Sequence, residues 1–316
     1  AIALDPSHAQ AHNGLGQVVY QLGQWDESVR EFEAALRIDP RIADVHNNLG
    51  VVQRAAGRLE EAVECFRRAV ALAPERVEMR NNLGAALHAA GELEEAEEHL
   101  LSAAQADPRV ANVRFNLSRL YLDQGRTDDA LAAAREAIAL NPRVADHHLA
   151  LAAAQRAGGD LEGELNTLRG AVAVEPNHAL ARSDLGACLN VMGRFEEAEA
   201  SLRRALDIDP RFAAAHENLA RTRRFGESDR RHVERLEGLA SQPNVSNADR
   251  VHLHFALGKM LDDMGEYERA MQHFVRGNAL EHERMNYDAE AGRAFVARSC
   301  ATFSAELVEE KRPLGS

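Results

Sequence analysis

The chain has 316 residues, a formal net charge of −13 and only 5% aromatic residues. A surface that binds nucleic acid needs clustered cations, so this acidic balance argues against a nucleic-acid partner. No apolar run approaches the roughly 18 residues that a membrane span requires. No signal peptide is visible either, and we therefore expect a cytoplasmic protein without a membrane partner.

The cysteines predict neither a disulfide framework nor a metal centre. Cys65, Cys188 and Cys300 are odd in number and far apart, and they lack the C-x-x-C spacing of a zinc site. We interpret them as small buried hydrophobic residues. No metal or cofactor is expected in this chain.

A period of 34 residues organises the sequence. Prolines recur at that interval, at Pro6, Pro40, Pro74, Pro108, Pro142, Pro176 and Pro210. Six regular units follow, over residues 9–42, 43–76, 77–110, 111–144, 145–178 and 179–212. Within each unit the apolar residues recur at spacings of three and four, which predicts two helices. A glycine separates the two helices, and Asp-Pro or Asn-Pro ends the second.

Fixed positions in the unit carry small residues. Position 8 is mostly Gly, and positions 20 and 27 are mostly Ala, while Leu at position 7 and Phe or Leu at position 24 fill the space between the helices. This pattern resembles the tetratricopeptide repeat (TPR) and is specific because it recurs in six consecutive units. The resemblance implies an all-α fold: an α-solenoid of about eight helix-turn-helix repeats in a right-handed superhelix, with a C-terminal capping helix.

The repeats divide the chain into five segments. The expected segments are the tail of a truncated repeat (1–8), six regular repeats (9–212), a degenerate seventh repeat with its loop (213–246), an eighth repeat (247–284) and a capping helix (285–316). In the fifth repeat Glu164 occupies a small-residue position. We expect its helix to be shifted so that Glu164 faces solvent, because a buried unpaired carboxylate is costly; a hinge is the alternative.

No residues predict an active site, so we expect no enzyme activity here. Of the histidines, His12, His46, His148, His216 and His254 occupy position 4 of their repeats. Successive position-4 residues are separated by at least a helix diameter, about 8–10 Å, too far to share a metal ion. We interpret them as structural. No phosphate-binding loop, nucleophile elbow or H-E-x-x-H motif occurs.

Binding is the better prediction. In the TPR family, positions 2, 5, 6 and 9 project toward the concave groove, and several of them are Asn here. Asn amides offer donors and acceptors, so a ladder of them would bind the backbone of a protein or extended peptide in that groove. The alternative is that they bond their own or neighbouring helices. The candidate residues are Asn13, Gln17, Asn47, Asn48, Arg54, Asn81, Asn82, Asn116, Arg119, Asp184 and Asn218. Ala150 is expected to interrupt the ladder.

A second resemblance concerns residues 252–288, HLHFALGKMLDDMGEYERAMQHFVRGNALEHERMNYD. This block is similar to the junction in bacterial proteins where TPRs precede a sulfotransferase domain. The resemblance implies a recruiting arm for a sulfotransferase that uses 3′-phosphoadenylyl sulfate, with the catalytic residues lying outside this sequence. The alternative is a stand-alone TPR scaffold for complex assembly.

Overall fold

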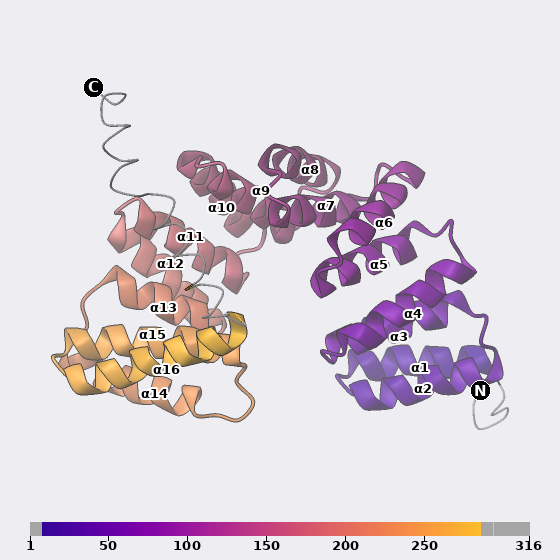
Figure 1. Ribbon diagram of the computed structural model, residues 1–316. Helices are drawn as coiled ribbons and strands as arrows, with labels where there is room; N and C mark the ends of the chain where they lie inside the picture. The colour runs from indigo at the N-terminus through magenta and orange to yellow at the C-terminus, as the bar shows by residue number, and fades with distance from the viewer. Residues whose placement is uncertain (1–7, 286–292, 294–316) are drawn as a thin grey trace. The chain divides into compact units, whose positions relative to one another are not determined.

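The structure, a computed structural model, describes residues 8–285 and residue 293 (Figure 1). Sixteen α-helices and one short 3-10 helix make up the secondary structure of this part of the chain, which contains no strand. The fold is therefore an all-α solenoid. The predicted tail before residue 8 and, apart from residues 285 and 293, the predicted capping helix lie outside the described residues.

The contacts divide the chain into two compact units, Ala1–Cys188 and Leu189–Ser316. The helices of the first unit are α1 (Ala9–Gln21), α2 (Trp25–Ile38), α3 (Ala43–Ala55), α4 (Leu59–Leu72), α5 (Val77–Ala90), α6 (Leu93–Ala106), α7 (Ala111–Asp123), α8 (Thr127–Leu140), α9 (Ala145–Ala157) and α10 (Leu161–Val174). The unit boundary falls within α11 (Ala179–Val191). The second unit continues with α12 (Phe195–Ile208), α13 (Ala213–Thr222), η1 (Glu227–Asp229), α14 (Arg230–Ala240), α15 (Asn247–Asp263) and α16 (Tyr267–Met285).

Small residues allow the two helices of a repeat to pack closely. A Cβ added to Gly50 would lie 2.7 Å from the ring of Phe66, and one added to Gly84 would lie 2.6 Å from Leu100. Where position 8 is Ser118, its hydroxyl donates to the carbonyl of Ala130 at 2.9 Å, so a polar side chain is tolerated at the crossing. The small residues that recur every 34 residues in the sequence thus mark the points where the two helices of each repeat cross closely.

Residues at the turns determine where the two helices of each repeat end. The turn between its two helices places Gly91 at φ +82°, in the left-handed region that favours glycine. At the end of the second helix, Asp107 Oδ1 accepts a hydrogen bond at 2.9 Å from the backbone N–H of Arg109 across Pro108. This Asx-type turn replaces the helical hydrogen bond that proline cannot donate.

The first unit has two layers of helices. Each second helix packs against the first helix of the next repeat, as α2 does on α3 and α4 on α5, and the first helices α1, α3, α5, α7 and α9 also contact one another in sequence. The core lies between the layers; Phe66, Leu83, Leu100 and Leu117 are at most 1% exposed. The layer of first helices therefore forms one continuous face of this unit.

The fifth repeat corrects the expectation for Glu164. Its side chain is 1% exposed rather than turned to solvent, and one carboxylate oxygen, Oε1, lies 2.6 Å from Nε of Arg156. A buried carboxylate is costly unless a partner offsets the loss of its hydration. Arg156, on the preceding helix, supplies that partner, so α10 keeps its place in the array.

Candidate functional site

Three pairs of asparagines link neighbouring repeats of the first unit. Nδ2 of Asn48 donates to Oδ1 of Asn13 at 3.1 Å. The same bond joins Asn82 to Asn47 and Asn116 to Asn81, each at 2.9 Å. Each bond runs from position 6 of one repeat to position 5 of the repeat before it. We call these three pairs the rungs.

The rungs exist because the first helices of neighbouring repeats contact one another. A residue on one first helix faces the residue 35 positions earlier, one more than the repeat length, because successive residues point about 100° apart around a helix and neighbouring helices meet through different sides. His147 of the fifth repeat follows the same rule, since its Nε2 lies 3.4 Å from Oδ1 of Asn112. The alternative weighed from the sequence, that these amides bond the neighbouring helix, describes their actual hydrogen bonds.

The rung residues remain only partly accessible. Asn13, Asn47 and Asn116 are 5–9% exposed, while Asn48, Asn81 and Asn82 are half-buried. Each rung uses one N–H of position 6 and the carbonyl oxygen of position 5. In the rung formed by Asn82 and Asn47, no hydrogen bond among the described residues is assigned to Nδ2 of Asn47 or to Oδ1 of Asn82. A rung can thus still offer one donor and one acceptor.

The other candidates surround the rungs unevenly. Gln17, Arg54 and Arg119 are exposed, and the guanidinium of Arg119 lies 5.7 Å from the ring centroid of Phe115. Asp184, in α11, is half-buried, and burial raises the pKa of its carboxyl group. Asn218 belongs to the second unit, where its backbone carbonyl oxygen accepts hydrogen bonds from Nδ2 of Asn190 and from the hydroxyl of Thr222.

The ladder ends after three rungs. The next rung would need amides at Phe115 and Ala150, and neither residue has one. Phe115 instead packs its ring 5.6 Å from that of His147. Ala150 is 5% exposed. The six rung residues therefore form the single continuous set of paired amides that the candidates provide.

The sequence interpretation missed what the position-4 residues do. Nε2 of His46 lies 2.9 Å from the carbonyl oxygen of Pro40, and Nε of Arg80 donates to that of Pro74 at 2.6 Å. The same contact recurs at His148, Arg182 and His216, each with the proline six residues earlier. A signal was present in the sequence, because a His or Arg follows these prolines at a constant spacing of six. These contacts tie five of the first helices, α3, α5, α9, α11 and α13, to the preceding turn.

Neither a metal cluster nor a reactive thiol emerges from the described residues. No group of three or more His, Cys, Asp or Glu side chains is placed to hold a metal ion there. Burial raises the pKa of Cys65 and of Cys188 to about 11, so both stay as thiols at neutral pH. Over the same range, no helix has the length and apolar character needed to cross a membrane.

Comparison with known proteins supports a TPR array. A family model described as "Cilia and flagella-associated protein 70 C-terminal domain" matches residues 1–225. A curated relative, an uncharacterized protein of Aquifex aeolicus (strain VF5), is 30% identical over 83 residues, which are 26% of this chain. The chain spans 11% of that relative's length.

Solved structures share the fold at low sequence identity. A tetratricopeptide repeat protein from Parabacteroides merdae has a TM-score of 0.60 at 15% identity, over 79% of this chain and 98% of its own. The match to the APC/C hetero-tetramer Cut9–Hcn1 has a TM-score of 0.63 at 17% identity and covers 70% of this chain and 44% of that one. The match to pilF of Pseudomonas aeruginosa has a TM-score of 0.56 at 22% identity and covers 67% of this chain and 96% of that one.

Proposed function

The chain belongs to the family described as the cilia and flagella-associated protein 70 C-terminal domain, and from this membership we propose that it is a protein-interaction scaffold whose first-helix face binds an extended peptide. The observation that carries the proposal is the set of three rungs at hydrogen-bond distances of 2.9–3.1 Å. They hold six amides at fixed positions on one face before any ligand arrives.

Such preorganisation favours recognition of a peptide backbone. An extended backbone presents alternating N–H and C=O groups, and a rung offers one donor and one acceptor. Because the amides are already fixed by each other, little side-chain entropy is lost when a peptide binds. Recognition would depend on the backbone more than on the peptide's side chains.

The test separates the structural role of a rung from its binding role. Asp in place of Asn47 and Asn81 keeps an oxygen that accepts from Asn82 and Asn116, but it removes the remaining N–H donors. Replacing Asn48, Asn82 and Asn116 by Ala is a poorer test, because it breaks the rungs themselves. A control with the same change in charge is Gln105→Glu with Asn141→Asp, at exposed positions in α6 and directly after α8.

A peptide selected from a random library by the full chain serves as the probe, and its binding is measured by fluorescence anisotropy. The variant N47D/N81D should bind it roughly tenfold or more weakly, since hydrogen bonds to the backbone are lost. The control should bind it as the unaltered chain does. N-methylation of the peptide backbone should weaken binding more than alanine substitution of its side chains. Equal affinity of N47D/N81D and the control would refute the proposal.

The recruiting role of this scaffold is a finer proposal. The resemblance of residues 252–288 to TPR–sulfotransferase junctions supports a parent protein in which the scaffold presents its bound peptide for sulfation. The alternative is a scaffold that assembles a complex without an enzyme domain. Sequencing the gene beyond residue 316 decides between them: a strand followed by a glycine-rich phosphosulfate loop within a few dozen codons supports the first, and its absence supports the second.

A further inference from the structure

The degenerate seventh repeat of the second unit contributes to a cavity that is open to solvent on one side. In the regular repeats the second helix packs directly on the first, whereas α13 and α14 each pack against α15. An extended segment, beginning at Arg223 with φ −144° and ψ 166°, leads from α13 to η1. The cavity, about 680 Å³, is lined by residues of α12, α13 and α14 and of the turn before α13. That volume falls in the range of small-molecule sites, roughly 300–1,000 Å³.

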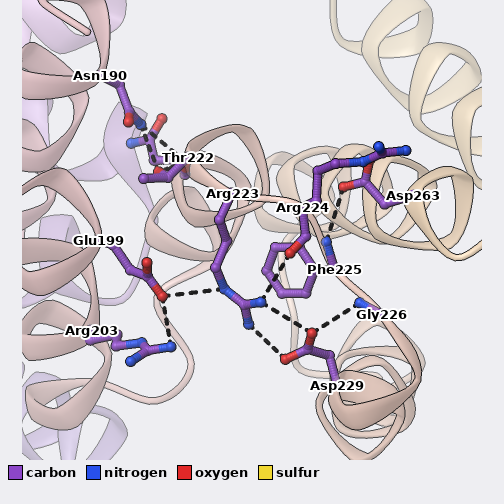
Figure 2. A network of polar contacts seen from close by, with 11 residues as sticks. Asn190, Glu199, Arg203, Thr222, Arg223, Arg224, Phe225, Gly226, Asp229 and Asp263 are labelled. Atoms are coloured by element: carbon purple, nitrogen blue, oxygen red, sulfur yellow. Dashed lines mark hydrogen bonds and ion pairs between the residues drawn. The ribbon is translucent and has the colours of Figure 1, made fainter. Parts of the chain in front are cut away.

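Ion pairs hold the extended segment in place (Figure 2). The guanidinium of Arg223 lies between Asp229, at 2.6 Å, and Glu199, at 3.3 Å, and covers the ring of Phe225 at 3.9 Å from its centroid. The backbone N–H of Phe225 donates to Asp263 of α15 at 3.3 Å. Because these contacts fix both ends of the segment, the cavity is part of the folded unit.

Two imidazoles in the cavity wall have unused nitrogen atoms. His216 is 4% exposed, and its Nε2 bonds the carbonyl oxygen of Pro210 at 3.0 Å, so its Nδ1 is an acceptor, and this buried atom has no partner. Nδ1 of His232 accepts from Arg235 at 3.0 Å, which leaves its Nε2 as a donor that is likewise buried without a partner. The rings are 5.2 Å apart. A buried donor and acceptor left unpaired favour a ligand that supplies both bonds.

The residues that line the cavity carry a net positive charge, whereas the whole chain is negatively charged. Four arginines but only two carboxylates line the cavity, while the chain carries a net charge of −13. Arg223 is paired with carboxylates, as described above. Arg211 and Arg235 are exposed, and the described residues place no carboxylate against either guanidinium. Leu206, Leu219, Leu236 and Leu239 supply an apolar surface beside them.

We propose that this cavity binds a small organic anion with an apolar body, whose anionic group is held by Arg211 and Arg235 and whose polar atoms bond His216 and His232. Arginine recognises carboxylates and phosphates through paired N–H donors, and four leucines receive the apolar body. The site is independent of the rungs, because every residue that lines it belongs to the second unit.

The test uses the fluorescent aromatic sulfonate 1-anilinonaphthalene-8-sulfonate as probe on the full chain. We expect saturable binding in the unaltered chain and a loss of affinity of roughly tenfold or more in R211Q/R235Q, because charge-assisted hydrogen bonds are removed. The control for each single variant, R211Q and R235Q, is Arg276→Gln, which also removes one charge and lies beside the other histidine pair of this unit, His254 and His273. It should leave the affinity unchanged.

Competition distinguishes the sources of the anion. Hexanoate and hexyl phosphate are titrated against the bound probe, with hexanol as the neutral analogue. Displacement by either anion but not by hexanol supports the site, and the stronger competitor identifies a carboxylate or a phosphate ester as the preferred class. The proposal is overturned if hexanol displaces the probe as well as the anions do, or if none of the three compounds displaces it. It is also overturned if R211Q/R235Q binds the probe with unchanged affinity. Because both arginines are exposed, the melting curve of R211Q/R235Q should match that of the unaltered chain; if it does not, the two single variants replace it.

Discussion

At the scale of single residues, the chain uses paired polar side chains to solve local problems of burial. Glu164 stands where other repeats have Ala or Ser, and it is tolerated because Arg156 binds its carboxylate at 2.6 Å. The position-4 residues have a different role, because their contacts with proline carbonyls, such as those of His46 and Arg80, lie at exposed positions. The ion pair satisfies a carboxylate that would otherwise be buried without a partner, whereas the position-4 contacts join a helix to the turn before it.

Removing Arg156 should therefore cost more stability than removing Glu164. We expect Arg156→Ala to lower the free energy of unfolding by about 1–3 kcal/mol, less than for a fully buried pair because Arg156 is half exposed. Glu164→Ala restores the small residue of the other repeats and should be nearly neutral. Chemical denaturation of both single variants and the double variant measures the coupling. Equal losses in the two single variants would contradict this account.

At the scale of helices, much of the fold follows from the 34-residue period, because close helix crossings need small residues and each turn needs glycine or proline. Bonding between asparagines of neighbouring helices was one of two alternatives from the sequence, but which asparagine pairs with which could not be predicted. Their 35-residue offset arises from how one first helix lies against the next, and a single repeat contains no information on that contact. The packing of both α13 and α14 against α15 was also hidden, since the apolar residues of α14, such as Val233 and Leu236, are spaced as in any second helix.

Overpacking one helix crossing tests the register of the whole array. Ala96 is 0% exposed, and its carbonyl oxygen would lie 3.2 Å from a Cβ added to Gly84. Ala96→Trp should destabilise the third repeat by roughly 1–3 kcal/mol or more, because the ring has no space between α5 and α6. Hydrogen exchange should then accelerate in these two helices. Glu98→Trp, at an exposed position of α6, is the control, and equal protection in both variants would show the register to be wrong.

At the scale of the molecule, buried histidines make the second unit sensitive to acid. The second unit contains four histidines whose pKa is lowered chiefly by burial: His232 and His254, each to about 4, and also His216 and His273. In the same unit a hydrogen bond to Glu217 raises the pKa of His252. Histidines of lowered pKa therefore outnumber the one of raised pKa.

Acid should destabilise the second unit well before carboxylates titrate. Below the unfolded histidine pKa of about 6.5, the unfolded chain takes up protons that the folded unit excludes, so stability falls as the pH falls from about 6.5 toward 4. His252 opposes this trend, because its raised pKa adds stability at low pH. Thermal melts between pH 7.5 and 4.5 should show the decline, and His254→Asn should make it shallower. An identical pH dependence in that variant would exclude His254 as a contributor.

The rungs also bear on how such an array lengthens. A unit with Asn at both position 5 and position 6, as in Asn47–Asn48 and Asn81–Asn82, is complementary to a copy of itself placed before or after it. Tandem duplication of residues 77–110 would therefore create one more rung without any further mutation. The outer members, Asn13 beside Gly14 and Asn116 beside Phe115, carry one amide each and end the series. Gene duplication can thus lengthen the ladder of rungs, and a single substitution at position 5 or 6 can end it.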